Sequence, residues 1–295
     1  MAARPTPVGA PVRLRRDRAA HPRQTTPRAG RRSGQRGRMT DPARMLTVEI
    51  DGPVATLTLN RPAKRNAMCD ALLDEIDGFF GAPPKGVRAV ILAGAGGHFC
   101  SGLDLSEHVS REAEEVLAHS RNWHRVMDRV QFSGLPVVSA LQGAVIGGGL
   151  ELACSTHVRV AEPGCIFQLP EGMRGIFVGG GATVRVGRIL GADRMCEMML
   201  TGRKYSTEEA AALGLAHYAV GPGEALAKAR ALASQVAKNA KLSNYMMIQA
   251  IARISDMAKP DGLFVESLCA AISQTSRDAE EGLNAFLEKR PPAFR

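Results

Sequence analysis

Short apolar runs alternate with segments of helical periodicity along this chain of 295 residues, and this alternation limits the fold more than any other feature of the sequence. Asp51-Gly52 divides the first apolar run in the way that a hairpin turn would. Strands that alternate with helices predict an α/β fold with crossover connections, and the hairpin predicts a sheet that is not purely parallel. The strand-like runs lie at 46–59, 88–94, 136–143 and 157–162, and helical spacing lies at 69–81, at 107–130 and after the glycines at 147–149.

Helical signals dominate the chain after residue 180. Ser206 and Glu209 have the spacing of a capping box at the start of a helix. The last quarter of the chain carries the apolar spacing of three or more helices. We therefore expect an α/β core over 39–220 and a helical region over 221–295.

The positive charge of the chain is concentrated at its N-terminal end. The formal net charge is +9, but residues 1–38 alone carry 11 Arg and a single acidic residue, Asp17. The rest is close to neutral, which argues against a nucleic-acid footprint on the core. Because 1–38 is rich in Arg, Pro and Gly and poor in large apolar side chains, we expect it to be disordered. A translation start at Met39 or Met45, a transit peptide and an RNA-binding tail are the alternatives for this segment.

We expect neither a membrane span nor a metal site. No apolar run approaches the roughly 20 residues that a bilayer requires. The six cysteines are scattered, without a C-x-x-C pair or a Cys/His cluster, and this arrangement is typical of reduced thiols in a cytoplasmic protein.

Three consecutive glycines, Gly147 to Gly149, stand between a predicted strand and a predicted helix. Glycine costs about 1 kcal/mol relative to alanine inside a helix, so the triplet indicates a close approach of the backbone to another group. The surrounding residues lack the Gly-Lys-Ser/Thr ending of a phosphate-binding loop and do not fit G-x-G-x-x-G. The free N–H groups at the helix start can instead hold an oxyanion, with a second donor from the turn at 101–104.

Two glutamates stand in apolar surroundings beside glycine-rich turns. Glu151 lies one helical turn after Gly148, and Glu171 follows Pro170 and precedes another glycine-rich turn. Burial raises the pKa of a carboxyl group, which can then act as an acid or a base near neutral pH. A salt-bridged or surface glutamate is the alternative for either residue alone. Together with the two glycine turns, they predict an acid–base site with an oxyanion hole.

Five blocks of the sequence occur in the order typical of the crotonase superfamily. They are LNRPAKRNAM (59–68), HFCSGLDL (98–105), ALQGAVIGGGLELA (140–153), FQLPEGMRGIFVGGGATVRV (167–186) and LTGRKYSTEEAAALGLAHYAV (200–220). From residue 46 to the end the chain therefore resembles that superfamily, and within it the enoyl-CoA hydratases. The resemblance implies a spiral of ββα units and a helical C-terminal trimerisation region. It also implies a homotrimer or homohexamer that binds acyl-CoA.

The resemblance assigns roles to individual residues. The oxyanion donors are the backbone N–H groups of Leu103 and Gly148, where glycine leaves room for a thioester oxygen. Glu151 helps to position and activate water, and Glu171 delivers a proton. Substrate contacts fall on Lys64, Arg65, Asn66, Ala67, Gly102, Asp104, Leu105, Gly147 and Gly179.

The implied reaction is hydration of a 2-enoyl-CoA to a 3-hydroxyacyl-CoA. It requires no metal and no cofactor beyond the coenzyme A of the substrate. Retention of both glutamates favours this reaction, and the alternatives are an enoyl-CoA isomerase and a hydratase-lyase acting on an aromatic enoyl-CoA.

The sequence departs from the family pattern at two places, of which the second concerns the acyl pocket. Val178-Gly179 stands where the family commonly has Pro-Gly, and Leu103 replaces a residue that is often small. By analogy the stretch at 107–130, with Trp123, covers the acyl tail. Trp123 and Met127 are four residues apart and fit ordinary core packing equally well, and we give His124 no catalytic role.

Overall fold

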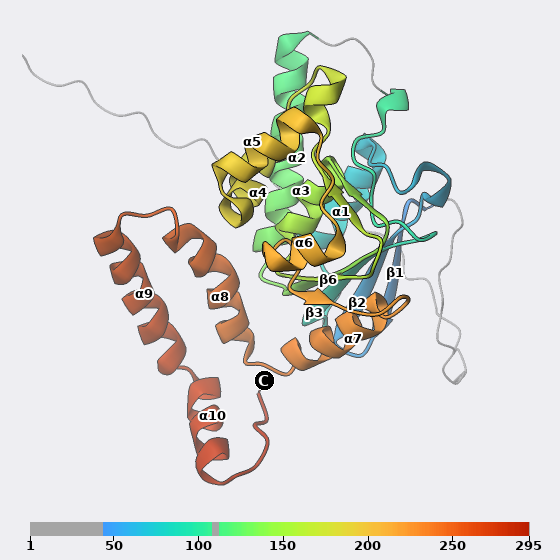
Figure 1. Cartoon of the computed structure of the whole chain (residues 1–295). Helices are drawn as coiled ribbons and strands as arrows, with labels where there is room; N and C mark the ends of the chain where they lie inside the picture. The colour runs from blue at the N-terminus through green and yellow to red at the C-terminus, as the bar shows by residue number, and fades with distance from the viewer. Residues whose placement is uncertain (1–43, 108–111, 295) are drawn as a thin grey trace, which may run out of the picture. The chain divides into compact units, whose positions relative to one another are not determined.

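A computed structural model describes residues 44–107 and 112–294 of the chain. The disorder expected for 1–38 lies outside these residues. The described residues all fall in one compact unit, Arg38–Arg295. Within it a mainly parallel sheet combines with many helices, which confirms the predicted α/β class (Figure 1).

The central sheet has six strands in the order β1-β2-β3-β4-β6-β8. The hairpin predicted around Asp51-Gly52 is confirmed, because β1 (Leu46–Asp51) and β2 (Val54–Leu59) pair antiparallel. The other strands add in parallel: β3 (Ala89–Gly94), β4 (Val137–Leu141), β6 (Val158–Ala161) and β8 (Tyr218–Ala219).

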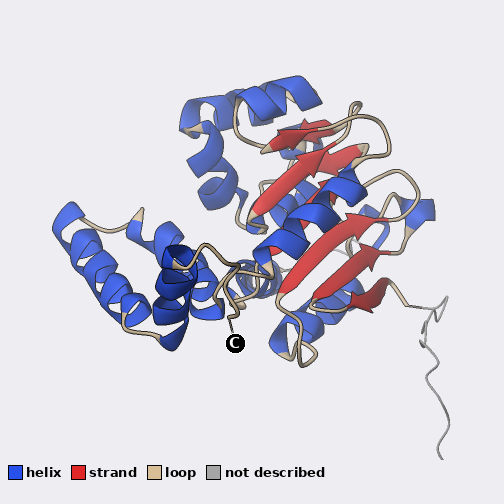
Figure 2. Cartoon of the chain, turned by 90° about the horizontal axis from the view of Figure 1, so that it is seen from below, coloured by secondary structure: helices blue, strands red, loops and turns tan. Residues whose placement is uncertain are grey.

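Helices cover both faces of this sheet, and alternate residues of β3 reach the two cores (Figure 2). Val90 and Leu92 point into the larger core, which α1 (Asp70–Gly81) and α2 (Ala113–Phe132) share. Ile91 lies in a smaller core against α7 (Ala225–Val236). The residues of α7 buried there are alanines, which let the helix approach the strands closely.

Seven more α-helices lie in the described part of the chain. They are α3 (Gly148–Ser155), α4 (Ala182–Leu190), α5 (Ala192–Thr201), α6 (Thr207–Ala212), α8 (Lys241–Ile254), α9 (Lys259–Gln274) and α10 (Arg277–Leu287). Four of the helices, α7 to α10, lie in the last quarter of the chain and confirm the prediction of three or more helices there. Gln249 Nε2 donates a hydrogen bond to Phe132 O at 2.7 Å and so connects α8 to the end of α2. Within 44–107 and 112–294, no helix combines the length and apolar character that crossing a bilayer would need.

The capping box predicted at Ser206 is present at the start of α6 (Thr207–Ala212). Ser206 Oγ accepts from Glu209 N at 3.3 Å, and Glu209 Oε2 accepts from Ser206 N at 2.8 Å. The two bonds satisfy backbone donors that the first turn of a helix leaves unpaired.

A second sheet consists of two short parallel strands, β5 (Ala144–Ile146) and β7 (Ile166–Gln168). The sequence patterns miss both strands because three residues are too few to show a periodicity. Ile146 pairs with Gln168, and Gly147 N donates to Gln168 O at 2.8 Å. Since parallel strands end at the same edge of a sheet, the glycine triplet and Glu171 leave this sheet side by side.

At each position of the triplet a different steric constraint favours glycine. Gly147 has a φ of +53°, a left-handed conformation that residues with a side chain rarely adopt. A Cβ on Gly148 would lie 2.6 Å from Cζ3 of Trp123, and a Cβ on Gly149 would collide with the carbonyl group of Cys100. Glycine is therefore required at 148 and 149 because neighbouring protein atoms fill the space.

We expect Gly149→Ala to lower the free energy of unfolding by about 1–3 kcal/mol, because the added methyl group meets backbone atoms that cannot rotate away. Gly78→Ala is the matched control, since Gly78 lies inside α1 and no atom lies within 4 Å of its Cβ position. Alanine at 78 should raise stability by about 0.5–1 kcal/mol. Urea denaturation of the parent and both variants measures the difference. Parent-like stability of Gly149→Ala would show that α3 can shift away from Cys100.

Candidate active site

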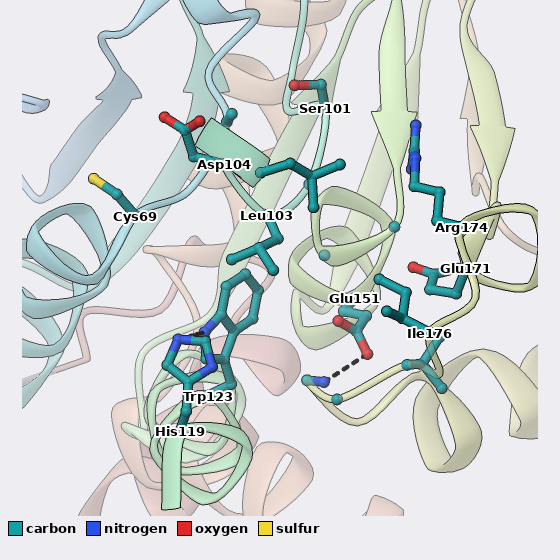
Figure 3. Close-up of a pocket in the computed structure, with 18 of the residues that line it drawn as sticks. Cys69, Ser101, Leu103, Asp104, His119, Trp123, Glu151, Glu171, Arg174 and Ile176 are labelled. Atoms are coloured by element: carbon teal, nitrogen blue, oxygen red, sulfur yellow. Dashed lines mark hydrogen bonds between the residues drawn. The ribbon is translucent and has the colours of Figure 1, made fainter. Parts of the chain in front are cut away.

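A cavity of about 550 Å³ lies where α2, α3 and η3 (Glu171–Arg174) meet the turn at 101–104. Figure 3 shows Glu151 and Glu171 close together, with Trp123 and His119 facing them from α2. All but one of the residues assigned from the sequence line this cavity: Lys64, Arg65, Ala67, Gly102, Leu103, Asp104, Leu105, Gly147, Gly148, Glu151, Glu171 and Gly179.

The turn at 101–104 and the glycine triplet meet directly. A Cβ on Gly102 would lie 3.2 Å from Gly148 N. Gly102 O accepts from Met68 N, and Asp104 N donates to Met68 O, so the N–H of Leu103 between them points away from Met68. Within the described part of the chain, the N–H groups of Leu103 and Gly148 donate to no other protein group. Two unused N–H groups at one cavity wall can stabilise a developing oxyanion.

The expectation from the sequence that glycine at 148 leaves room for a thioester oxygen is wrong. The missing Cβ of Gly148 points toward Trp123 and the side chain of Met68, and not into space for a thioester oxygen. The structure gives Gly148 no positive φ. Glycine is needed at 148 because the indole ring packs directly on the first turn of α3.

Glu151 is buried, with 3% of its surface exposed, and its Oε1 accepts hydrogen bonds from Gly180 N at 2.8 Å and Ala182 N at 2.9 Å. Burial raises the pKa of this carboxyl group above its usual range, and the two N–H groups and the charge of Arg185 reduce the rise without cancelling it. One oxygen is therefore fixed, and Oε2 carries no hydrogen bond from a described residue.

Glu171 is buried to a similar degree, with 7% exposed, in a setting with fewer donors. Burial raises the pKa of its carboxyl group to about 7, and repulsion from Glu151 adds to the increase. Its Oε2 is the one buried side-chain oxygen or nitrogen in 44–107 and 112–294 that has no hydrogen-bond partner. A carboxyl group that is partly protonated near neutral pH can both give and take a proton.

Asp104 connects the turn at 61–68 with the turn at 101–104, which we call the oxyanion turn. Its carboxylate accepts from Ser106 Oγ at 2.7 Å, from Arg61 Nη2 at 2.8 Å and from Lys64 Nζ at 3.2 Å. These bonds, with that from Ser106 the strongest influence, hold the pKa of Asp104 well below its usual range. Asp104 thus positions basic side chains, of which Lys64 is 47% exposed and can reach a phosphate group.

Asn66 is the assigned residue that does not line the cavity. Its side chain is fully buried, its Oδ1 accepts from Arg61 N at 2.9 Å, and its Nδ2 donates to Ala95 O and His98 O. It also has a φ of +57°. The side chain therefore stabilises the turn, and its polar atoms are not available to a ligand.

His119 and Ser120 line the cavity although the sequence analysis assigned them no role. They precede Trp123 by four and three residues on α2, so one helical face carries all three side chains. Trp123 Nε1 donates to His119 Nε2 at 3.2 Å, and Ser120 Oγ donates to Gly179 O at 2.7 Å. Their positions four and three residues before Trp123 in a predicted helix could have identified them as neighbours of Trp123 at the cavity. Trp123 itself lines the cavity and is buried, so it is both wall and core.

We expect Gly148→Ala to lower kcat by about 10²-fold, because moving the indole ring or the start of α3 by about 1 Å misplaces the oxyanion donor. The contacting atoms belong to the six-membered ring of Trp123, which leucine lacks. Combining Gly148→Ala with Trp123→Leu should therefore restore kcat to within a few-fold of Trp123→Leu alone. Steady-state kinetics on the three variants measure this. A Gly148→Ala variant as active as the parent would contradict the steric account.

Comparison with known proteins agrees with this geometry. The sequence model of the family described as enoyl-CoA hydratase/isomerase matches residues 49–295. The human protein named enoyl-CoA hydratase domain-containing protein 2, mitochondrial, is 33% identical over 83% of this chain and 86% of its own length. A solved structure from Rhodopseudomonas palustris CGA009, provisionally named an enoyl-CoA hydratase, is 48% identical, covers 84% of this chain and 96% of its own, and has a TM-score of 0.81. A solved enoyl-CoA hydratase from Bacillus anthracis is 30% identical over 85% of this chain and 99% of its own, with a TM-score of 0.80. The chain therefore belongs to the enoyl-CoA hydratase/isomerase family, the crotonase superfamily that its sequence blocks resemble.

Proposed function

We propose that this protein adds water to 2-enoyl-CoA thioesters and forms 3-hydroxyacyl-CoA. The observation that carries the proposal is a single cavity lined by two buried carboxyl groups, Glu151 and Glu171, and by two unused backbone N–H groups, those of Leu103 and Gly148. Hydration needs a polarised thioester oxygen, a base for water and a proton for the α-carbon. The cavity supplies one group for each task.

In the proposed reaction, the N–H groups of Leu103 and Gly148 bind the thioester oxygen and stabilise the negative charge that develops on it. Glu151, whose Oε1 is held in place by hydrogen bonds from Gly180 and Ala182, takes a proton from water in its ionised form as the water oxygen bonds to Cβ. Glu171 in its protonated form gives a proton to Cα. Return of the proton from Glu151 to Glu171 completes the cycle, so atoms and charges balance.

The coenzyme A part of the substrate is proposed to bind along the turn at 64–67. Lys64 and Arg65 provide positive charge at the mouth of the cavity, and the backbone of Ala67 lies at its wall. Water is the only reactant besides the enoyl-CoA, and coenzyme A enters as part of that substrate.

An isomerase that moves a double bond between carbons is the second candidate. It transfers a proton from one carbon to another, for which a single carboxyl group suffices. Glu171 favours this alternative in one respect, because its pKa of about 7 lets one group act as both base and acid.

Replacing each glutamate by glutamine separates the two reactions, because glutamine keeps the size of glutamate but cannot exchange a proton. For a hydratase we expect Glu151→Gln and Glu171→Gln each to lower kcat by about 10²-fold or more. Hydration of a 2-enoyl-CoA and isomerisation of its 3-enoyl isomer are to be measured in both variants, after a check of folding and CoA binding. If Glu151→Gln keeps the main activity within a few-fold of the parent, the two-carboxylate mechanism fails and the isomerase takes its place.

We also propose that the protein assembles as a homotrimer or homohexamer through its C-terminal helices. On α9, the exposed side chains of Phe264, Leu268 and Ile272 are four residues apart and form an apolar stripe. On α10, Phe286 and Leu287 are also exposed. A second copy of the chain could cover these surfaces.

Light scattering after size-exclusion chromatography tests the assembly. We expect a trimer or hexamer for the parent and a smaller species for Leu268→Glu/Ile272→Glu, because charges in the stripe oppose its burial. Glu266→Gln is the matched control and should leave the assembly unchanged, because Glu266 is two residues from both Phe264 and Leu268 and so lies on the opposite side of the helix from the stripe. A monomeric parent would show that these helices serve another purpose.

A further inference from the structure

Arg185 is not among the residues that line the cavity, and the proposed reaction gives it no task. It belongs to α4 and is buried, with 8% of its surface exposed. Its guanidinium contacts α2 and the turn before α4. Nε donates to Gln131 Oε1 at 2.7 Å, Nη2 to Asp128 Oδ1 at 2.5 Å, and Nη1 to Gly180 O at 3.3 Å.

The turn that Arg185 contacts is the same turn that holds Glu151. Gly180 uses its N–H to bind Glu151 Oε1 and its carbonyl oxygen to bind Arg185. Between the two donors, Gly181 has a φ of +105°, and a Cβ on it would collide with Nη1 of Arg185. The guanidinium therefore packs directly on the backbone whose N–H groups orient the carboxylate.

The charge of Arg185 acts on Glu151 as well. The titratable groups around this carboxylate are Cys154 on α3, Glu171 on η3 and Arg185 on α4. Beyond the guanidinium on α2 lie Asp128, which is exposed, and His124, whose pKa burial lowers. Glu171 repels a charge on Glu151, the Cys154 thiol stays neutral because burial raises its pKa, and Arg185 favours the ionised form.

We propose that Arg185 is a positioning residue for Glu151, which fixes the turn at 180–182 whose N–H groups orient the carboxylate and places a positive charge near it. This inference rests on the proposed hydratase function. Without the positive charge, Glu151 would bind a proton at higher pH, and without the forked contacts its N–H donors would lose their fixed geometry.

The test is the pH profile of kcat/KM for hydration in Arg185→Gln. Because a base must be deprotonated, raising the pKa of Glu151 moves the acidic limb of the profile to higher pH, and we expect a shift of about one unit. We expect kcat at neutral pH to fall about tenfold with little change in KM. Arg188→Gln is the matched control, because Arg188 lies on the same helix and pairs at the surface with Asp256. The pH profile and the kcat of Arg188→Gln should match those of the parent.

The inference is overturned if Arg185→Gln folds and has the acidic limb and the kcat of the parent.

If Arg185→Gln does not fold, Arg185→Lys provides the test, because an ammonium group keeps the charge but cannot reach all three acceptors. We then expect a kcat about fivefold to tenfold lower, by about the value of one ordinary hydrogen bond, with the acidic limb unshifted. A parent-like kcat would overturn the inference. Glu151→Gln in the same assay separates the two proposals. If it stays active, the hydratase mechanism fails, and if it is inactive while Arg185→Gln resembles the parent, the role of Arg185 alone fails.

Discussion

The pairing of β5 with β7 is the constraint on which the site depends. Two strands of three residues are only marginally stable alone, and backbone hydrogen bonds to neighbouring segments stabilise this pair. Cys100 forms an isolated β-bridge with Val145, and Phe167 forms one with Tyr205. The first bridge brings the oxyanion turn beside β5, and the strand pairing brings Glu171 beside the glycine triplet. Segments that are distant in the sequence thus meet through backbone hydrogen bonds, whose geometry is fixed more tightly than that of side-chain contacts.

The two carboxyl groups of the cavity have different surroundings, which fit the different tasks proposed for them. Both are buried, and burial alone would raise both pKa values. Glu151 receives two backbone N–H groups and the field of Arg185, which oppose the rise. Glu171 receives no hydrogen bond on Oε2 and is repelled by Glu151, so its pKa reaches about 7. The pKa of Glu151 is nevertheless raised, so the two groups differ in the fixed orientation of Glu151 Oε1 and in the unbonded Oε2 of Glu171.

Much of this arrangement could be predicted from the sequence, because long elements carry periodicity and family blocks carry the site. The hairpin, the buried strands and the capping box at Ser206 follow from local patterns. What depends on distant residues could not be predicted. β5 and β7 are too short to show a pattern, the missing Cβ of Gly148 points at a ring on another helix, and Asn66 turns inward to bind Ala95 and His98. The assembly and the cytoplasmic location stay predictions, and the human relative is named a mitochondrial protein.

In the proposed reaction, Trp123 would link the choice of substrate to the geometry of catalysis. Its ring would meet a Cβ on Gly148, which carries an oxyanion donor, and would lie 3.0 Å from a Cβ on Gly180, which holds Glu151. One side chain therefore packs on both turns and also forms a wall of the cavity. An acyl group large enough to displace the ring would move the donor and the base together, because interiors are close-packed and transmit such shifts. The other walls, where Ile176 and Phe177 are partly exposed, can yield without that consequence. Acyl groups of different size are thus expected to be accommodated beside these residues, while the indole ring keeps its place against the two turns.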